Sequence, residues 1–313
     1  MTSPSPRRRG IIIVAVLFVG LALLGLMLGR FAALQREVIP VSSAAETMMV
    51  FDELGYSRDA WAEIYPVVPR MGLTHWPEGW SDEIDVETKK TLFLMAMASL
   101  ALRANETIIE DRERLLSLRD PQDLGTRDAR WLSELALRYK VISSENAEIG
   151  PDEIARLKRL VDVIPASLVL AQAAIESGWG TSRFATEANA LFGQWTWEDD
   201  GMVPSEQRGE LGDYRIKSFP TTLYSVAAYM LNLNSHAAYS GLRDRRGGLR
   251  EAGQTVSGLE LAATLTAYSE RGQAYVDELS GLINGNGLSN LDEADLSRGG
   301  LVVIKPFGAW AQP

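Results

Sequence analysis

One run of the sequence constrains the fold more than any other, because it is uncharged over ten residues and then stops at a single acid. Pro165 suits the first turn of a helix, since its missing N–H is not needed there. No residue from Ala166 to Ile175 is charged, which predicts a helix buried on most of its sides. Glu176 follows, and Ser177-Gly178 ends the helix because Gly tolerates the left-handed cap conformation. The run therefore predicts a buried helix with one carboxylate at its last turn.

The setting of Glu176 predicts an acid with an altered pKa. Trp179 comes just after the helix end, so we expect the carboxyl group to lie half-buried beside an indole. Loss of hydration raises the pKa of a carboxyl group, and the partial negative charge of a helix C-terminus acts in the same direction. A Glu that stays protonated near neutrality can donate a proton to a glycosidic oxygen. The structural alternative is that Glu176 pairs with a nearby cation such as Arg183.

The motifs around this helix resemble a bacterial enzyme family. AIESGWGTSRFA followed by NALFGQWTW is similar to the Bax-type proteins, which belong with the flagellar and autolysin β-N-acetylglucosaminidases of glycoside hydrolase family seventy-three. Further similar motifs are DVETKK at 85–90, ALRANETIIEDRERLL at 101–116, MLNLNSHAAY at 230–239 and YSERGQAYVDEL at 268–279. The resemblance covers about residues 83–290. It implies an endo-β-N-acetylglucosaminidase that acts on peptidoglycan glycan strands, with Glu176 as the single general acid.

The sequence patterns predict a mainly α fold. Residues 84–118 predict one long helix or two in tandem, and residues 127–141 and 151–161 predict two shorter helices. Residues 198–219 predict a β-hairpin, which is the main β-structure that we expect. Together with the resemblance, these patterns indicate a lysozyme-like helical domain with one small β-hairpin and an N-terminal transmembrane helix.

The expected organisation has five parts. They are a cytoplasmic tip and anchor at 1–30, a linker and irregular segment at 31–83, a helical region packed on the catalytic domain at 84–162, the catalytic domain at 163–290 and a tail at 291–313. Within the second part, residues 40–45 are expected to be a linker and residues 52–64 a helix. From Asn284 onward we expect loose order.

The resemblance implies two more catalytic residues. Related glucosaminidases carry a second acid on the hairpin, for which Glu206 suits the family spacing better than Asp200, Glu210 or Asp213; each of these acids can also be a plain surface carboxylate. Tyr268 is expected to line the cleft near the general acid. A phenol there can hydrogen-bond an N-acetyl group or a developing charge.

Substrate-binding candidates surround these positions. Trp195 and Trp197 alternate with Thr196, so one face of a short strand would carry both indoles, which stack well on sugar rings; packing in the core is the alternative. Gly193 is expected to allow a close backbone approach. The full set of substrate-binding candidates is Trp179, Asn189, Phe192, Gly193, Trp195, Trp197 and Tyr275, with core packing as the preferred role of Tyr275.

The composition excludes several chemistries. The chain has no cysteine, so thiolate nucleophiles, disulfides and Cys-bound zinc are excluded. The two histidines, His75 and His236, lie far apart, and no HExxH pattern is present. We therefore expect neither a metal site nor a cofactor.

The N-terminal segment predicts a membrane anchor. Three arginines precede an uncharged apolar run at residues 11–29, long enough to span a bilayer core. The run is Leu-rich to its end and is followed by Arg30, which favours an uncleaved anchor over a signal peptide. The arginines stay cytoplasmic by the positive-inside rule. We expect a single-pass protein of the cytoplasmic membrane with its bulk outside.

Charge argues against a nucleic-acid partner. Residues 1–30 hold four of the 31 basic residues and no acid, which leaves 27 basic against 41 acidic residues in the exported part. That part repels polyanions. The expected partner is the peptidoglycan glycan strand. A lytic transglycosylase, a muramidase and a membrane-tethered glycan-binding scaffold with a vestigial site remain as alternatives.

Overall fold

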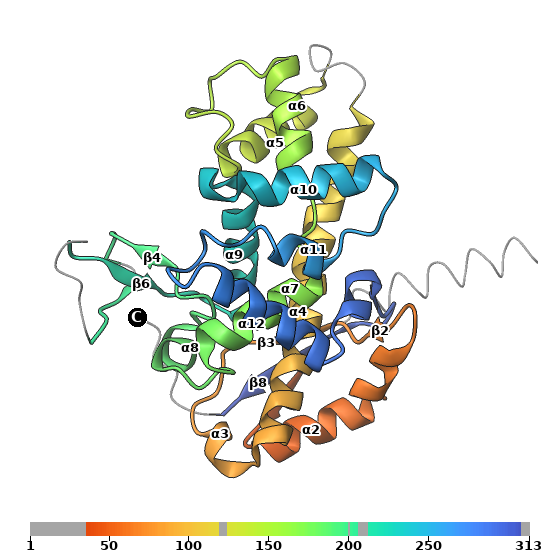
Figure 1. The fold of residues 1–313 in the computed structure, drawn as a ribbon, viewed down its shortest axis with the longest axis vertical. Coiled ribbons are helices and arrows are strands. Elements are labelled where there is room, and N and C mark those ends of the chain that lie inside the picture. Colours follow the sequence, from red (N-terminus) through yellow and green to blue (C-terminus); the bar gives the residue numbers. More distant parts are fainter. Residues whose placement is uncertain (1–35, 119–123, 200, 206–211, 308–313) are drawn as a thin grey trace, which may run out of the picture.

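The computed structural model describes residues 36–118, 124–199, 201–205 and 212–307, apart from the side chains of Ser81 and Glu83 (Figure 1). The predicted anchor at 11–29 and the predicted second acid Glu206 lie outside these residues. Helices dominate the described ranges, and the mainly α fold class is confirmed.

The elements follow one another along the chain with short connections. The helices are α2 (Ala44–Glu53), α3 (Trp80–Glu83), α4 (Val86–Ser117), α5 (Thr126–Arg138), α6 (Pro151–Leu160), α7 (Ala166–Ser177), α8 (Arg183–Ala188), α9 (Thr222–Ser235), α10 (Ser240–Glu251), α11 (Gly258–Ala262) and α12 (Gln273–Gly285), with 3-10 turns η1 (Arg58–Ala62), η3 (Ala237–Tyr239) and η4 (Ser289–Glu293). The strands are β1 (Arg36–Val41), β2 (Val67–Val68), β3 (Met71–Leu73), β4 (Trp195–Thr196), β5 (Gly201–Met202), β6 (Arg215–Lys217), β7 (Asp295–Leu296) and β8 (Leu301–Pro306).

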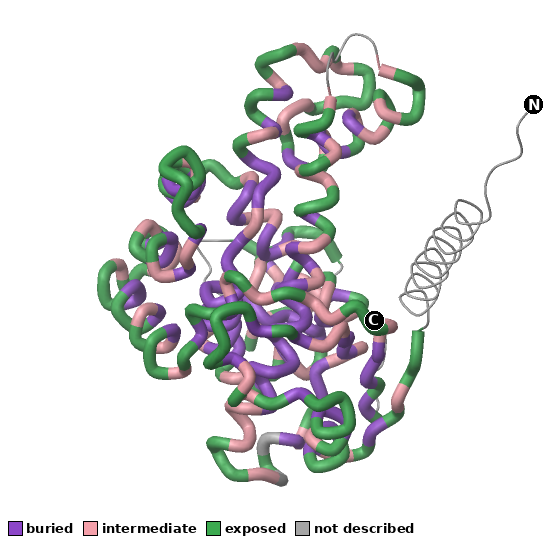
Figure 2. The backbone as a smooth tube through the Cα atoms, turned by 90° about the vertical axis from the view of Figure 1, so that its right-hand side faces the viewer, coloured by how far each residue is buried: buried purple, intermediate pink, exposed green. Residues whose placement is uncertain are grey.

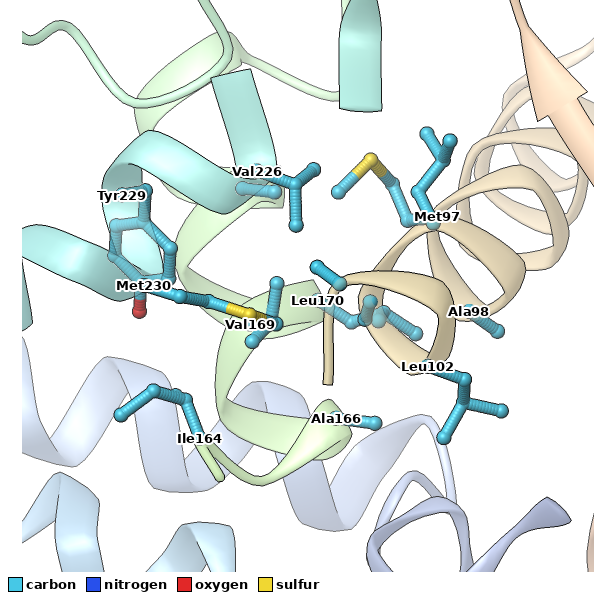
Figure 3. Close-up of a cluster of buried hydrophobic side chains, with 14 of the residues drawn as sticks. Met97, Ala98, Leu102, Ile164, Ala166, Val169, Leu170, Val226, Tyr229 and Met230 are labelled. Carbon is cyan, nitrogen blue, oxygen red and sulfur yellow. The ribbon is translucent and has the colours of Figure 1, made fainter. Parts of the chain in front are cut away.

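Helix α7 lies at the centre of the molecule. It packs against α4, α11, α12 and η4, and α4 packs against α9 in turn. Figure 3 shows Val169 and Leu170 of α7 between Met97 of α4 and Met230 of α9. Every residue from Ala166 to Ala174 is buried, which is why the run can lack charge. The predicted buried helix is confirmed.

Helix α4 is the long axis on which the other elements are arranged. Residues 86–117 form one continuous helix, which begins where the Asp85 carboxylate accepts the N–H groups of Glu87 and Thr88. This is the one described helix long and apolar enough to cross a membrane, and 67% of its apolar window is buried inside the protein. We therefore interpret α4 as a core helix. Helices α5 and α6 cover one end of it and α2 and α3 the other (Figure 1).

The two ends of the described chain meet in a parallel sheet, which corrects the expected linker and loose tail. Strand β8 lies between β1 and β3, with Arg36 opposite Leu301 and Val41 opposite Pro306. Val302, Val303 and Ile304 are buried, and Figure 2 shows this part of the backbone against the buried core. The prediction of a linker at 40–45 and a helix at 52–64 is wrong. A strand and the start of α2 occupy the first segment, and the end of α2 and a 3-10 turn occupy the second.

A second, antiparallel sheet projects to one side of the helices (Figure 1). Its order is β4-β6-β5, with Trp195 opposite Ile216 and Gly201 opposite Lys217. The predicted hairpin is present as β5 and β6. Strand β4 adds a third strand that the sequence analysis did not assign to it.

Candidate active site

The last turn of α7 positions Glu176. Gly178 caps the helix in the left-handed conformation, and Trp179 also has a positive φ, of 60°. The Trp179 N–H donates to the Ala174 carbonyl at 2.9 Å, which closes the helix end. The turn leaves Glu176 half-buried at the edge of the core. Its position on the helix is the predicted one.

The Glu176 carboxylate accepts a hydrogen bond from Tyr275 of α12. The Tyr275 hydroxyl oxygen lies 2.7 Å from Oε1 of Glu176. Burial raises the pKa of Glu176, the Tyr275 hydrogen bond opposes that rise, and the charges of Glu278 and Arg271 act in opposite directions. Glu278 and Arg271 also pair with each other at 2.6 Å. The result is a carboxyl group whose pKa is raised and whose Oε1 is already occupied as an acceptor.

Two further polar side chains stand behind Tyr275. Nε2 of Gln172 donates to the Tyr275 hydroxyl at 2.9 Å, and the Tyr229 hydroxyl donates to Oε1 of Gln172. Gln172, Tyr229 and Tyr275 have exposed fractions of 0%, 1% and 2%. A buried chain of hydrogen bonds thus runs from α9 through α7 to α12 and ends on Glu176.

Tyr268 lies next to this chain. Its ring stacks on that of Tyr275, with centroids 5.5 Å apart and planes 7° apart, and Tyr239 lies 5.8 Å beyond it. The predicted neighbourhood of Tyr268 and Glu176 therefore exists, with the Tyr275 ring between the two residues. A row of tyrosines leads from the half-buried surface to the carboxylate.

Trp179 faces a different part of the molecule from the one expected. Its ring meets Phe93 edge-on at 5.8 Å, and Lys90 lies over the ring at 5.6 Å. It lines a cavity of about 480 Å³ together with Trp76 and Trp80. The aromatic side chain hydrogen-bonded to Glu176 is Tyr275, so the expected contact with the indole is corrected.

Arg183 does not pair with Glu176. Its guanidinium lies 3.6 Å from the Glu187 carboxylate, one turn along α8, and donates to the Val203 carbonyl at 3.0 Å. The structural alternative considered for Glu176, an ion pair with Arg183, is therefore absent here.

The two tryptophans of the small sheet are open to solvent. Trp195 is 44% exposed and Trp197 is 67% exposed. Their rings meet edge-on at 6.4 Å, and Tyr214 lies 4.8 Å from Trp195. The exposed indole faces are available to a sugar ring.

Three substrate-binding candidates take structural roles instead. Asn189 is 0% exposed, accepts the Trp76 N–H and donates to the Phe219 carbonyl. Phe192 is buried and stacks on Tyr229 at 3.9 Å. A Cβ at Gly193 would meet no atom within 4 Å, so its φ of 60° explains the glycine and a close approach does not.

The described residues contain neither the proposed second acid nor a metal cluster. Asp200, Glu206 and Glu210 lie outside the described ranges, and Asp213 is exposed. Within those ranges no group of three or more His, Cys, Asp or Glu side chains is placed to hold a metal ion.

The sequence analysis missed Gln172 and Tyr229. One signal for Gln172 was available, because it is a polar residue in an uncharged buried helix and lies four positions before Glu176, on the same face. A buried amide needs partners for both of its ends. Tyr229 gives no such signal, since its helix is apolar around it.

Comparison with known proteins agrees with the motifs. A family model described as glucosaminidase (mannosyl-glycoprotein endo-β-N-acetylglucosaminidase) matches residues 152–288. Protein bax of Escherichia coli (strain K12) is 33% identical over 199 residues, which are 63% of this chain and 70% of that protein. The crystal structure of the catalytic domain of the autolysin Auto from Listeria monocytogenes aligns with 59% of this chain and 96% of its own, at 18% identity and a TM-score of 0.33. The family model and the identity to the Escherichia coli protein show that this chain is a glycoside hydrolase of the Bax-type glucosaminidase family, glycoside hydrolase family seventy-three.

Proposed function

We propose that this protein hydrolyses the β-1,4 bond after N-acetylglucosamine in peptidoglycan glycan strands, with Glu176 as the general acid. The observation that carries the proposal is the half-buried Glu176 carboxyl at the end of α7, with a raised pKa and a hydrogen bond from Tyr275. A raised pKa keeps a larger fraction of the acid protonated near neutrality. The glucosaminidase model that matches residues 152–288 includes this helix.

The proton transfer follows from which carboxyl oxygen is already engaged. Because Oε1 of Glu176 accepts the Tyr275 hydroxyl, Oε2 carries the proton. That proton moves to the glycosidic oxygen as the bond from the sugar C1 breaks, and the bonding electron pair stays on the departing oxygen. A water then attacks C1, activated by a second carboxylate or assisted by the N-acetyl group of the substrate.

The exposed aromatic side chains supply the sugar contacts. Trp195 and Trp197 offer indole faces on the small sheet, and Tyr268 stands one ring from the partner of Glu176. Stacking on the apolar C–H faces of sugars orients a glycan without adding charge. Tyr268 is the residue we assign to the N-acetyl group.

Glu206 is our candidate for the second acid. Inversion requires about 6.5–9.5 Å between the two carboxyl groups, and direct nucleophilic retention about 5–5.5 Å. Single replacement of Glu206, Glu210 and Asp213 by Ala, assayed on purified sacculi, tests the assignment. A large loss for Glu206→Ala alone supports it. Equal and small losses at all three positions favour assistance by the substrate N-acetyl group.

Product analysis tests the reaction itself. Mass spectrometry of digested sacculi should show reducing-end N-acetylglucosamine. An anhydro sugar end would identify a lytic transglycosylase, a reducing-end N-acetylmuramic acid would identify a muramidase, and tight binding without cleavage would identify a scaffold. Each of these three results contradicts the proposal.

We also propose that residues 11–29 anchor the protein in the cytoplasmic membrane with its bulk outside. The motive is the uncharged run that follows Arg7, Arg8 and Arg9. Carbonate extraction should leave the protein in the membrane, and protease added to spheroplasts should digest it. Release into the soluble fraction with a new N-terminus near residue 30 would show cleavage instead.

A further inference from the structure

We propose that Gln172 and Tyr229 are positioning residues of the glycosidase site, which together set the direction in which the Tyr275 hydroxyl donates to Glu176. The three residues of this hydrogen-bonded relay, Tyr229, Gln172 and Tyr275, come from α9, α7 and α12. The inference rests on the proposed function for its effect on catalysis, whereas its effect on the Glu176 pKa stands independently of that function.

The carboxamide of Gln172 gives the relay its direction. An amide has one end that only donates and one end that only accepts. Nε2 of Gln172 donates to the Tyr275 oxygen, so that oxygen acts as an acceptor on the Gln172 side. The hydroxyl proton of Tyr275 is left to point at Oε1 of Glu176, 2.7 Å away. If the amide were reversed, Tyr275 would donate to Gln172 and Glu176 would lose its partner.

Tyr229 keeps the amide from reversing. Its hydroxyl donates to Oε1 of Gln172, and its ring is held in the core by stacking on Phe192 at 3.9 Å with planes 7° apart. Figure 3 shows the Tyr229 side chain among apolar residues that include Ile164 and Met230. With the Tyr229 donor fixed by packing, the accepting end of the amide must face it.

Burial makes the relay persistent. Gln172 is 0% exposed and Tyr229 is 1% exposed, so water does not compete for their hydrogen bonds. Burial also raises the pKa of Tyr229 well above its ordinary value. The pKa of Tyr275 is likewise raised by burial and by the Glu176 charge. Both phenols therefore remain protonated donors at every pH at which a carboxyl group titrates.

The consequence for Glu176 is a restrained rise in pKa. Burial raises the pKa of Glu176 and the Tyr275 donation lowers it, while the paired charges of Glu278 and Arg271 oppose one another. Loss of the directed hydroxyl removes the main opposing contribution, so the pKa rises further. A general acid must be protonated, so the activity falls as pH rises through this pKa. The basic limb of the pH–rate profile reports the relay.

The test compares three variants of the full chain with the wild type. Gln172→Met keeps an unbranched side chain but removes both hydrogen bonds, and Tyr229→Phe removes only the hydroxyl at the far end. Tyr56→Phe is the matched control, because Tyr56 is also buried and donates to the Met95 carbonyl but has no part in the relay. The pH dependence of kcat/KM on purified glycan strands and the Glu176 pKa, from ¹³C-carboxyl NMR assigned with Glu176→Gln, are measured for each.

We expect the basic limb and the NMR pKa to move up by about one unit in Gln172→Met and by less in Tyr229→Phe, the scale expected for one hydrogen bond to a carboxylate. Tyr56→Phe should move neither. Unchanged or lowered pKa values in both relay variants would overturn the inference, and Tyr229→Phe alone decides if Gln172→Met does not fold. Full activity of Glu176→Gln would instead sink the proposed function, and the NMR pKa would still test the relay.

Discussion

The carboxyl group of Glu176 has a raised pKa, so its ionisation opposes folding. Burial is the main cause of the shift. A group whose pKa is higher in the folded than in the unfolded state contributes stability below the unfolded pKa and loses it as pH rises through the folded pKa. The site therefore sacrifices stability at neutral pH to keep an acid in place.

This sign leads to a prediction for Glu176→Gln. The neutral amide can still accept the Tyr275 hydroxyl, and it has no ionisation to suffer. We expect the variant to have a higher Tm than the wild type at pH 7, with the difference vanishing near pH 4 and below. Calorimetry at the two pH values measures it. A lower Tm for the variant at pH 7 would show that the ionised carboxylate is stabilised in the fold.

At the residue scale, local sequence was enough to find Glu176 but not its partners. The acid stands out because it ends an uncharged run beside a Gly cap, and both signals lie within a few positions of it. Tyr275 lies 99 positions away along the chain, so no local pattern joins the two. Asn189 was assigned to substrate because of its motif, whereas its amide serves two backbone groups inside the core.

At the element scale, the start of α7 is held by a distant acid. Asp292 accepts the Ser167 N–H and hydroxyl and the Gly258 N–H, at 2.8–2.9 Å, and so caps α7 and α11 together. Helix N-termini leave such N–H groups unpaired within the helix. Because α7 carries Glu176 at its other end, this cap fixes the helix on which the site depends.

We predict that Asp292→Ala destabilises the protein by about 3 kcal/mol, since three buried donors lose their acceptor. Burial raises the pKa of Asp292 to about 6. The stability advantage of the wild type over the variant should therefore be largest below about pH 4 and shrink as pH rises through 6. Urea unfolding at several pH values measures this, with Glu293→Ala, at the exposed neighbouring residue, as the control. Equal losses for the two variants would contradict the capping role.

The helices were predictable from sequence where their patterns are local. Residues 84–118, 127–141 and 151–161 match α4, α5 and α6 closely, because apolar periodicity and capping residues mark their ends. Strands β1 and β8 were missed because each is stabilised mainly by the other, from the opposite end of the described chain. Pairing partners so distant leave no periodic signal within either segment.

At the scale of the whole molecule, β8 joins the first and last described segments of the chain. It is the central strand of β1-β8-β3, and three consecutive residues on it, Val302, Val303 and Ile304, are buried. Each buried aliphatic side chain stabilises the fold by about 1.5–3 kcal/mol. Their sum approaches the whole stability of an ordinary domain.

We therefore predict that truncation after Gly300 abolishes cooperative unfolding or lowers Tm by more than about 10 °C, in line with the loss of several kcal/mol. Truncation after Phe307 keeps β8 and serves as the control. Thermal denaturation followed by circular dichroism measures both proteins. A protein ending at Gly300 that melts like the control would restore the expectation of a dispensable tail.

The central claim, that Glu176 donates the proton, is tested most directly by the rate of glycan cleavage in Glu176→Gln. Wild type and variant are compared on purified sacculi at equal concentration, with circular dichroism to show that both are folded. We predict a loss of 10²-fold or more, the scale of general acid catalysis, in a protein at least as stable as the wild type at pH 7. A variant that keeps most of the wild-type rate would remove Glu176 from the mechanism.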